Sequence, residues 1–285
     1  REGEACFLKA LQRNPQDAMA LNNLSQLYVN IAQPMKAINC ADRAIRLDPG
    51  LKDAPYNRGL AMLQLGNWAE GWEGYEQNLG RHKWRKERTY GIVPRWTGVN
   101  GLKIVAYGEQ GIGDEISFAS CIPDLMKENE VIIECDSRLH SLFHRSFGCK
   151  TFGTRYQDGI SWPLKHNIDA SVAFGSLPKF FRKKDEDFPG TPYLKADPER
   201  RIMFRTLLDS LDEPGQPRKK KIGIAWAGGL KETGAARRSV PLYDMMPILR
   251  QDAHFVSLNY RDADEALLIE DNHGVKVHHW PWAVM

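Results

Sequence analysis

The first 80 residues carry apolar side chains at intervals of three and four positions, the spacing that gathers them on one face of a helix. The segment 18–31 shows this pattern in five residues: Leu21, Leu24, Leu27, Tyr28 and Ile31. A short turn follows, and the segment 34–47 repeats the helical spacing. The pattern predicts pairs of amphipathic helices, and each pair needs a neighbour to bury its apolar face.

These helical pairs recur with a period of 34 residues. Asn14-Pro15 corresponds to Asp48-Pro49, and further matches join three pairs of positions: Ala10 with Ala44, Leu11 with Ile45, and Asn23 with Asn57. A helix–turn–helix unit of this length resembles the tetratricopeptide repeat, and about two and a half units fit before residue 80. A generic array of helical hairpins is the alternative, and it predicts nearly the same surface.

Beyond Gly101 the pattern changes to short apolar runs that alternate with helical stretches. The runs predict strands at 102–107, 131–135, 150–152 and 169–174, with helices at 114–128 and 138–147. Short buried strands separated by helices are typical of a parallel, doubly wound sheet. A helix at 198–211 and a linker then lead to a second alternation, which has strands at 221–226, 254–258 and 275–278 and a helical stretch at 240–250.

The expected architecture is therefore α + α/β in four parts. We place a helical repeat domain at 1–90, a Rossmann-like domain at 91–197, a linker helix and loop at 198–220, and a second Rossmann-like unit at 221–285. About three strands are too few for a complete doubly wound domain. The chain also starts at Arg1 rather than Met and stops at Met285 without a tail-like composition. We expect it to be a fragment of a longer protein.

Composition and charge narrow the functional classes. The 285 residues include 39 Lys and Arg against 36 Asp and Glu, a formal charge of +3 that is too balanced to indicate nucleic-acid binding. The basic run 218–221 lies in a linker, where solvation is its simplest role. Five widely spaced cysteines indicate reduced thiols, no apolar run approaches a membrane span of ~20 residues, and no signal peptide precedes the repeats. We expect a cytoplasmic protein.

The segment 107–116 is the most informative part of the chain, because a glycine-rich turn joins a predicted strand to a predicted helix. Such turns bring backbone close to a ligand, and the first N–H groups of the helix point at it. The spacing G-x-x-G-x-G-D differs from the dinucleotide and phosphate-loop patterns. Asp114 would also compete with a phosphate for the helix N–H groups. We expect Gly111 and Gly113 to lie where a Cβ atom would crowd the turn or the cleft. We expect Asp114 at the start of the helix, facing the inter-domain space and a sugar hydroxyl or a proton-transfer partner.

Other features have simpler explanations. An aromatic group could stack on sugars, but tryptophans at helical spacing beside a domain junction more often pack; it comprises Trp68, Trp72, Tyr75, Trp84 and the segment 94–98 with Trp96. Glu134 and Asp136 follow the glycine-rich turn by about twenty residues, as a ribose-binding acid does, although the glycine spacing argues against a dinucleotide site. The histidines at 273, 278 and 279 have no partner cluster, so no metal site is expected. No nucleophile elbow of a hydrolase occurs.

Several segments together resemble a known bacterial family. They occupy residues 65–72, 94–98, 108–115, 134–139, 226–229, 238–242 and 278–280. In order and content they are similar to tetratricopeptide-repeat proteins fused to a glycosyltransferase domain of the GT-B fold, related to the heptosyltransferases of glycosyltransferase family 9. The resemblance implies two Rossmann-like halves, the first for the acceptor and the second for the nucleotide-sugar donor. It also implies inverting transfer without a metal or a cofactor beyond that co-substrate.

The resemblance implies roles for particular residues. Asp114 becomes the candidate base, and the acceptor side comprises the loop residues Gly108, Glu109, Gln110, Gly111 and Gly113. The donor phosphates would meet Gly228, Gly229, Arg238 and Ser239. The repeats would help to recognise a protein or glycan acceptor. The alternatives are that Asp114 only caps its helix, that Arg238 makes a surface ion pair, and that the protein is a non-catalytic binding scaffold.

Two departures from the family pattern matter. Residue 227 is Ala where related chains often carry Arg, and the family's later donor loop is absent from the sequence. The resemblance therefore implies that this piece binds donor weakly and is inactive alone. An uncovered apolar face on the second unit would favour association between copies.

Overall fold

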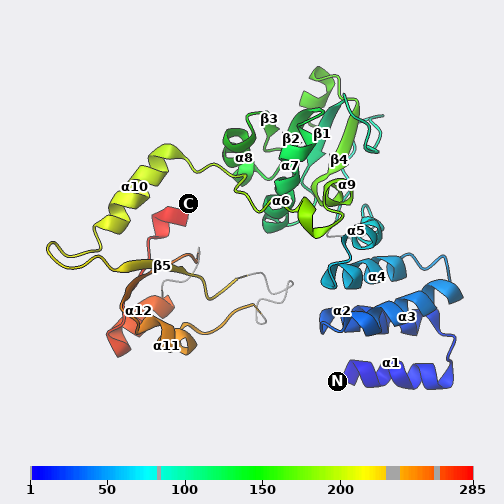
Figure 1. Cartoon of the computed structure of the whole chain (residues 1–285), viewed down its shortest axis with the longest axis horizontal. Coiled ribbons are helices and arrows are strands. Elements are labelled where there is room, and N and C mark those ends of the chain that lie inside the picture. The colour runs from blue at the N-terminus through cyan, green and yellow to red at the C-terminus, as the bar shows by residue number, and fades with distance from the viewer. Residues whose placement is uncertain (1, 82–84, 229–237, 260–263, 285) are drawn as a thin grey trace. The chain divides into compact units, whose positions relative to one another are not determined.

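The computed structural model describes residues 2–81, 85–228, 238–259 and 264–284 (Figure 1). The chain divides into two compact units, Arg1–Ala196 and Asp197–Met285. The first unit contains the helical repeats together with a four-stranded sheet, and the second contains a three-stranded sheet. The predicted order of helical repeats followed by parallel α/β structure is confirmed.

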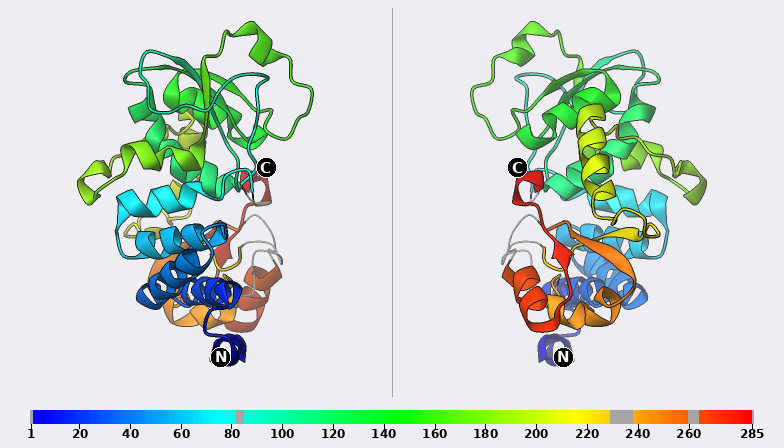
Figure 2. Two further views of the ribbon diagram at one scale, coloured as in Figure 1. Left: turned by 90° about the vertical axis from the view of Figure 1, so that its right-hand side faces the viewer. Right: turned by 90° about the vertical axis from the view of Figure 1, so that its left-hand side faces the viewer.

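Five helices form the repeat region: α1 (Glu2–Arg13), α2 (Ala18–Asn30), α3 (Pro34–Leu47), α4 (Asp53–Gln64) and α5 (Trp68–Glu76). Consecutive helices lie side by side in both views of Figure 2. Asp17 caps α2 by accepting a hydrogen bond from the Ala20 N–H, and Pro34 opens α3. Helices α4 and α5 approach closely, because a Cβ on Gly59 or Gly74 would lie 2.6–2.7 Å from facing backbone atoms.

The first sheet is parallel throughout. Its strands are β1 (Lys103–Tyr107), β2 (Glu130–Glu134), β3 (Lys150–Phe152) and β4 (Ala170–Ala173), in the order β3-β2-β1-β4. Each strand falls within two residues of its prediction. The chain moves outward from β1 through β2 to β3 and then returns to the other side of β1. The direction of winding therefore reverses between β1 and β4, the position where open α/β sheets bind ligands.

The two faces of this sheet are covered differently. Ile104 and Ala106 of β1 join a core with helical residues such as Phe143, whereas Val105 and Tyr107 pack toward Tyr90 and other residues outside the helices. Helices follow three of these strands along the chain. After β1 come α6 (Ile112–Phe118) and α7 (Ile122–Leu125), after β2 comes α8 (His140–Phe147), and after β4 comes α9 (Pro178–Phe181). The single helix predicted over 114–128 is wrong in extent. A 3₁₀ turn at Ala119–Cys121 and the proline at 123 divide it into α6 and α7.

The second unit has α10 (Pro198–Asp209), β5 (Lys220–Ile224), α11 (Met246–Leu249), β6 (Ala253–Ser257), α12 (Asp264–His273) and β7 (Val277–His278). The strands are parallel in the order β5-β6-β7. The predicted helix over 240–250 is a 3₁₀ turn at Leu242–Met245 followed by the single turn of α11. Pro241 precedes the first turn and Pro247 opens the second, which limits both.

The aromatic cluster at the junction packs, as expected. Trp72 makes edge contacts with Tyr75 and Phe118, with ring centroids 5.6 and 6.2 Å away. Trp96 is 6% exposed and lies against Phe180, 4.5 Å between centroids. These contacts join the repeat helix α5 and the segment 94–98 to the sheet domain, so Trp72 and Trp96 are packing residues. Trp84 lies outside the described residues.

Candidate functional site

The glycine-rich loop lies where the first sheet reverses its winding. Residues 108–111 connect the carboxyl end of β1 to α6, and a 3₁₀ turn at Phe174–Ser176 follows the neighbouring strand β4. The two loops are bonded to each other, because the Gly175 N–H donates to Glu109 Oε1 at 3.2 Å. Gly175 has no room for a Cβ, which would lie 2.5 Å from the Glu109 carboxylate. At the carboxyl edge between β1 and β4, the β4 loop therefore packs directly against the Glu109 carboxylate.

Glu109 is held by a buried arginine. Arg85 and Glu109 are 1% and 4% exposed, and Arg85 Nε donates to Glu109 Oε1 at 3.2 Å. Arg85 also donates to the Tyr75 carbonyl and to Ser176 Oγ, at 2.9 and 3.2 Å. Burial raises the pKa of Glu109, while Arg85 opposes that rise. The pair fastens helix α5, the glycine-rich loop and the β4 loop together, so Glu109 is structural rather than open to an acceptor.

A second buried carboxylate explains the first glycine of the motif. Glu115 accepts a hydrogen bond from the Asp136 N–H at 3.0 Å and pairs with Arg155. A Cβ on Gly108 would lie 2.3 Å from the Glu115 carboxyl carbon. Burial raises the pKa of Glu115, and the Asp136 N–H and Arg155 oppose the rise. Gly108 is therefore required by a neighbouring carboxylate, not by the turn itself.

The carboxyl end of β2 carries two more arginine-bound acids. Glu134 is fully buried and accepts hydrogen bonds from Arg88 Nη2 at 2.9 Å and from the Tyr90 hydroxyl at 2.5 Å. Arg138 donates two hydrogen bonds, of 3.0 and 2.8 Å, to the Asp136 carboxylate. These bonds hold the pKa of Asp136 below its usual range. Both side chains are engaged within the protein, which agrees with the argument against a ribose-binding acid.

Asp114 differs from these four acids. It is exposed, lies in the first turn of α6, and has no ion pair among the residues that the structure describes. Its Oδ2 accepts a hydrogen bond from the Gly111 N–H at 3.0 Å. That bond caps α6 and fixes the direction of the carboxylate. The capping role is therefore present in the structure, and it leaves the carboxylate accessible from solvent.

The other loop residues divide into two groups. Gln110 accepts a hydrogen bond from the Tyr75 hydroxyl at 2.7 Å and donates to Glu109 at 3.0 Å, so it belongs to the buried brace. A Cβ on Gly111 would lie 3.1 Å from Asp114 Oδ2. A Cβ on Gly113 would meet no atom within 4 Å, so the prediction that it would crowd the turn or the cleft is wrong for Gly113.

Three of the four predicted donor residues, Gly228, Arg238 and Ser239, are described and lie in the loops that follow β5. The Gly228 N–H donates to Ser239 Oγ at 3.3 Å, and the Val240 N–H donates to the Trp226 carbonyl at 2.8 Å. Arg238 is exposed, and no ion pair is found for it within the described segments. Gly229 lies outside the described residues. No sequence pattern pointed to Asn259, which is 4% exposed and accepts a hydrogen bond from the Trp226 N–H at 3.3 Å. Its amide nitrogen has no hydrogen-bond partner among the described residues.

The described ranges contain no group of three or more His, Cys, Asp or Glu side chains arranged to hold a metal ion. They also contain no helix of the length and apolar character that a membrane crossing requires.

Comparisons with known proteins place part of this chain. The tetratricopeptide repeat model matches residues 6–39, which confirms the repeat assigned from the 34-residue period. Protein FlbA of Caulobacter vibrioides is 27% identical over 323 aligned positions, which cover 94% of this chain and 53% of FlbA. The chain thus spans about half the length of this relative. A mutant O-GlcNAc transferase of Thermobaculum terrenum matches over 97% of this chain and 70% of its own, at 13% identity and a TM-score of 0.27.

Proposed function

We propose that the protein transfers a sugar from a nucleotide-sugar to an acceptor hydroxyl by a single displacement, with Asp114 as the general base. The acceptor oxygen would attack the anomeric carbon, the nucleoside diphosphate would leave, and the hydroxyl proton would pass to Asp114. This inverts the anomeric centre. The step needs a carboxylate within hydrogen-bond reach of the hydroxyl and does not itself require a metal ion.

One observation carries the proposal. Five carboxylates occupy residues 109–115 and 134–136, at the carboxyl edge of the first sheet. Four are buried and bound to arginines, whereas Asp114 is exposed and held only by the Gly111 N–H. A base must be both fixed and accessible, and among these five acids Asp114 alone meets both conditions. Its position beside the reversal of winding supports a ligand-facing role.

The donor is assigned to the second unit on separate grounds. The described part of its carboxyl edge presents uncharged groups, namely Gly228, Ser239, Ser257 and Asn259, with the exposed cation Arg238 beside them. N–H and hydroxyl groups with one guanidinium suit a diphosphate ester better than a cationic or apolar ligand. No cofactor enters the proposal, because the nucleotide-sugar is a co-substrate.

The decisive test of the base is Asp114→Asn in the full-length protein. Asn retains an oxygen that accepts from the Gly111 N–H, so the cap and the fold should persist while the proton acceptor is lost. We expect transfer to fall roughly 10²-fold or more. Asp114→Ala removes both the helix cap and the proton acceptor. Ser117→Ala, on the same helix, serves as the control. Turnover that is normal in Asp114→Asn would reduce Asp114 to a cap.

The donor assignment is tested by calorimetry with UDP-, GDP-, ADP- and CMP-sugars. Arg238→Ala should weaken binding of the preferred donor by about tenfold, the loss of one charge-assisted contact. Arg250→Ala removes another exposed arginine of the same unit and should leave binding unchanged. Equal affinity in both variants would place the diphosphate elsewhere.

The repeats support a second candidate, a non-catalytic scaffold that binds proteins. The observation in its favour is the matched repeat at residues 6–39, because stacked repeats commonly present binding surfaces. Donor turnover separates the two functions. A full-length protein that binds no nucleotide-sugar but retains partner binding would establish the scaffold.

A further inference from the structure

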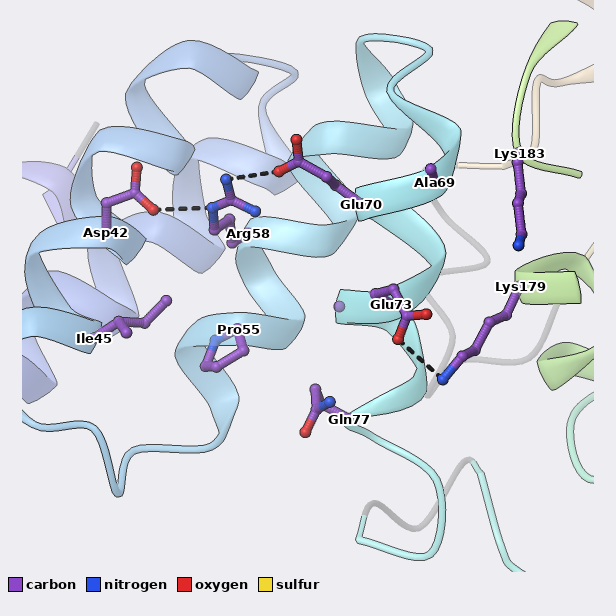
Figure 3. A pocket seen from close by; sticks show the side chains of 11 residues that line it. Asp42, Ile45, Pro55, Arg58, Ala69, Glu70, Glu73, Gln77, Lys179 and Lys183 are labelled. Atoms are coloured by element: carbon purple, nitrogen blue, oxygen red, sulfur yellow. Dashed lines mark hydrogen bonds and ion pairs between the residues drawn. The ribbon is translucent and has the colours of Figure 1, made fainter. Parts of the chain in front are cut away.

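The last repeat helix, α5, is tied both to the helices before it and to the sheet domain after it. Arg58 of α4 bridges Asp42 of α3 and Glu70 of α5, at 2.9 and 2.8 Å (Figure 3). One turn further along α5, Glu73 pairs with Lys179 of α9 at 2.9 Å, as Figure 3 also shows. Helix α5 therefore belongs to both parts of the first unit.

Tyr75 extends from α5 to both ends of α6. Its side chain is buried, and its ring centroid lies 6.1 Å from that of Phe118, the last residue of α6. Its hydroxyl donates to Gln110 Oε1 at 2.7 Å, in the glycine-rich loop just before that helix. One side chain of the repeat region thus contacts the end of the helix that carries Asp114 and the loop that precedes it.

The Gln110 amide is held on three sides. Its Nε2 donates to Glu109 Oε1 at 3.0 Å, and its Oε1 accepts from Tyr75, so the two partners fix which end of the amide is the oxygen. The third side is the β4 loop, because a Cβ on Gly175 would lie 2.6 Å from Nε2. Burial raises the pKa of Tyr75, so its hydroxyl stays protonated and remains the donor. The Tyr75 hydroxyl therefore fixes the direction of the Gln110 side chain.

The peptide bond after Gln110 carries the N–H that directs Asp114. The Gly111 N–H donates to Asp114 Oδ2 at 3.0 Å, and this bond caps α6. Gly111 has no side chain whose packing could hold its backbone, so the orientation of this peptide plane depends on Gln110. Three consecutive links therefore join the repeat helix to the acid: Tyr75 to Gln110, Gln110 to Gly111, and Gly111 to Asp114.

We propose that Tyr75 is a positioning residue for Asp114, so that the last repeat helix forms part of the frame that holds the base. Tyr75 does not touch the substrate. It fixes Gln110, and Gln110 fixes the N–H that directs the Asp114 carboxylate. The effect on rate rests on the proposed transfer reaction, whereas the arrangement itself can be measured without turnover. The repeats would then take part in catalysis independently of any partner that they bind.

Exchange of the Gly111 amide hydrogen measures the arrangement directly. Glycine-selective isotope labelling of the full-length protein isolates its NMR signal, which is assigned by its loss in Gly111→Ala. Tyr75→Phe removes the hydroxyl and keeps the ring, so exchange should become about fivefold faster as the cap opens more often. Tyr56→Phe is the matched control, because the Tyr56 ring lies 5.9 Å from that of Tyr75 and its hydroxyl interacts with Asn78 instead. Equal exchange in the two variants would overturn the proposal.

Steady-state kinetics tests the consequence for transfer. Tyr75→Phe should lower kcat about tenfold and leave the KM of both substrates within about twofold, because the base is present but less well directed. Tyr56→Phe should leave kcat and KM unchanged. A raised KM with a normal kcat would mean that Tyr75 affects substrate binding, and the positioning role would be wrong.

A double-mutant cycle tests whether Tyr75 acts through Gln110. Gln110→Met removes the amide and keeps a side chain of similar length, so kcat should fall at least as far as in Tyr75→Phe. Adding Tyr75→Phe to Gln110→Met should then change kcat by less than about twofold. Fully additive losses would contradict the route through Gln110. If the wild-type protein transfers no sugar but Tyr75→Phe still speeds exchange at Gly111, the positioning stands and the proposed reaction fails.

Discussion

The carboxyl edges of the two sheets are built from different chemistry. At the edge of the first sheet, four buried acids are bound by Arg85, Arg88, Arg138 and Arg155. At the described edge of the second sheet, the buried polar groups are Ser257 and Asn259, and hydrogen bonds to neutral groups replace ion pairs. Both edges end parallel strands, but the first sheet reverses its winding between β1 and β4, whereas the described strands of the second sheet follow the single order β5-β6-β7. Parallel pairing is common to both sheets, and the chemistry of each edge is set by the residues that the loops bring there.

The difference has a mechanical consequence. A buried ion pair is costly to break, because each partner left alone remains charged in a poor solvent. The first edge is consequently rigid, and it presents one exposed acid from a fixed frame. The second edge keeps an amide nitrogen of Asn259 unbonded within the described residues. A donor that is left free at low exposure favours a ligand with an acceptor group, because an unmade buried hydrogen bond is unfavourable.

The largest effect should come from breaking the brace of the first edge. Arg85→Met leaves Glu109 buried without its cation, so we expect the first unit to lose about 3–5 kcal/mol of unfolding free energy. Denaturant titration followed by hydrogen exchange of β1 peptides measures this and assigns it to the first unit. Arg81→Met, at an exposed 3.9 Å pair with Asp53, is the control and should cost less than about 1 kcal/mol.

The double variant Arg85→Met/Glu109→Gln sharpens the interpretation. Removing the charge of Glu109 as well should recover part of the loss, because the penalty arises from the unpaired charge. A loss below about 1 kcal/mol in Arg85→Met would show that the brace does not stiffen this edge, and the contrast between the two sheets would fail.

Alanine substitutions of Gly108 and Gly113, one at each end of the loop, should change stability in opposite directions and by less than Arg85→Met does. Gly108→Ala forces a Cβ against the Glu115 carboxylate, which Arg155 and the Asp136 N–H hold in place, so we expect a loss of about 1–3 kcal/mol. Gly113→Ala meets no atom within 4 Å inside α6 and should stabilise the helix by about 0.5–1 kcal/mol. Thermal unfolding of both variants gives the signs. Equal effects would mean that the loop relaxes around Glu115.

The smallest effect concerns the dependence of stability on pH. Arg138 lowers the pKa of Asp136 in the folded state, so the pair contributes stability above the ordinary Asp pKa of about 3.9, which is lost as the pH falls through the folded pKa. Arg138→Met should therefore lower stability above pH ~4, by less than about 1 kcal/mol because Arg138 is largely exposed, and make no difference in stronger acid. Lys165→Met should show no such dependence. A deficit that persists undiminished in strong acid would contradict the assignment.

The sequence predicted the fold more completely than the site. The repeat period and the alternating apolar runs located α2, α3 and each of the seven strands in the described part of the chain to within about two residues, because both signals come from neighbouring positions along the chain. Helix ends were less accurate where Pro123 and Pro247 interrupt an otherwise apolar run. For the site, the sequence located the start of α6 and placed Asp114 in its first turn, and the role of Asp114 as a base stays a prediction. The sequence assigned Glu109 and Gln110 to the acceptor side, where the structure uses them as a buried brace.

The sequence by itself determined the repeats, the strand positions and the placement of an acid in the first turn of α6, since each depends on residues within a few positions of one another. Tertiary structure decided which acids are buried and which one stays open. The arginines that bind Glu109, Glu134 and Glu115 are 24, 46 and 40 positions away along the chain. No local pattern encodes such pairs, because they form only when the sheet brings distant segments to one edge. Asp114 stands out as a candidate base because its neighbours are neutralised by residues that the sequence leaves far apart.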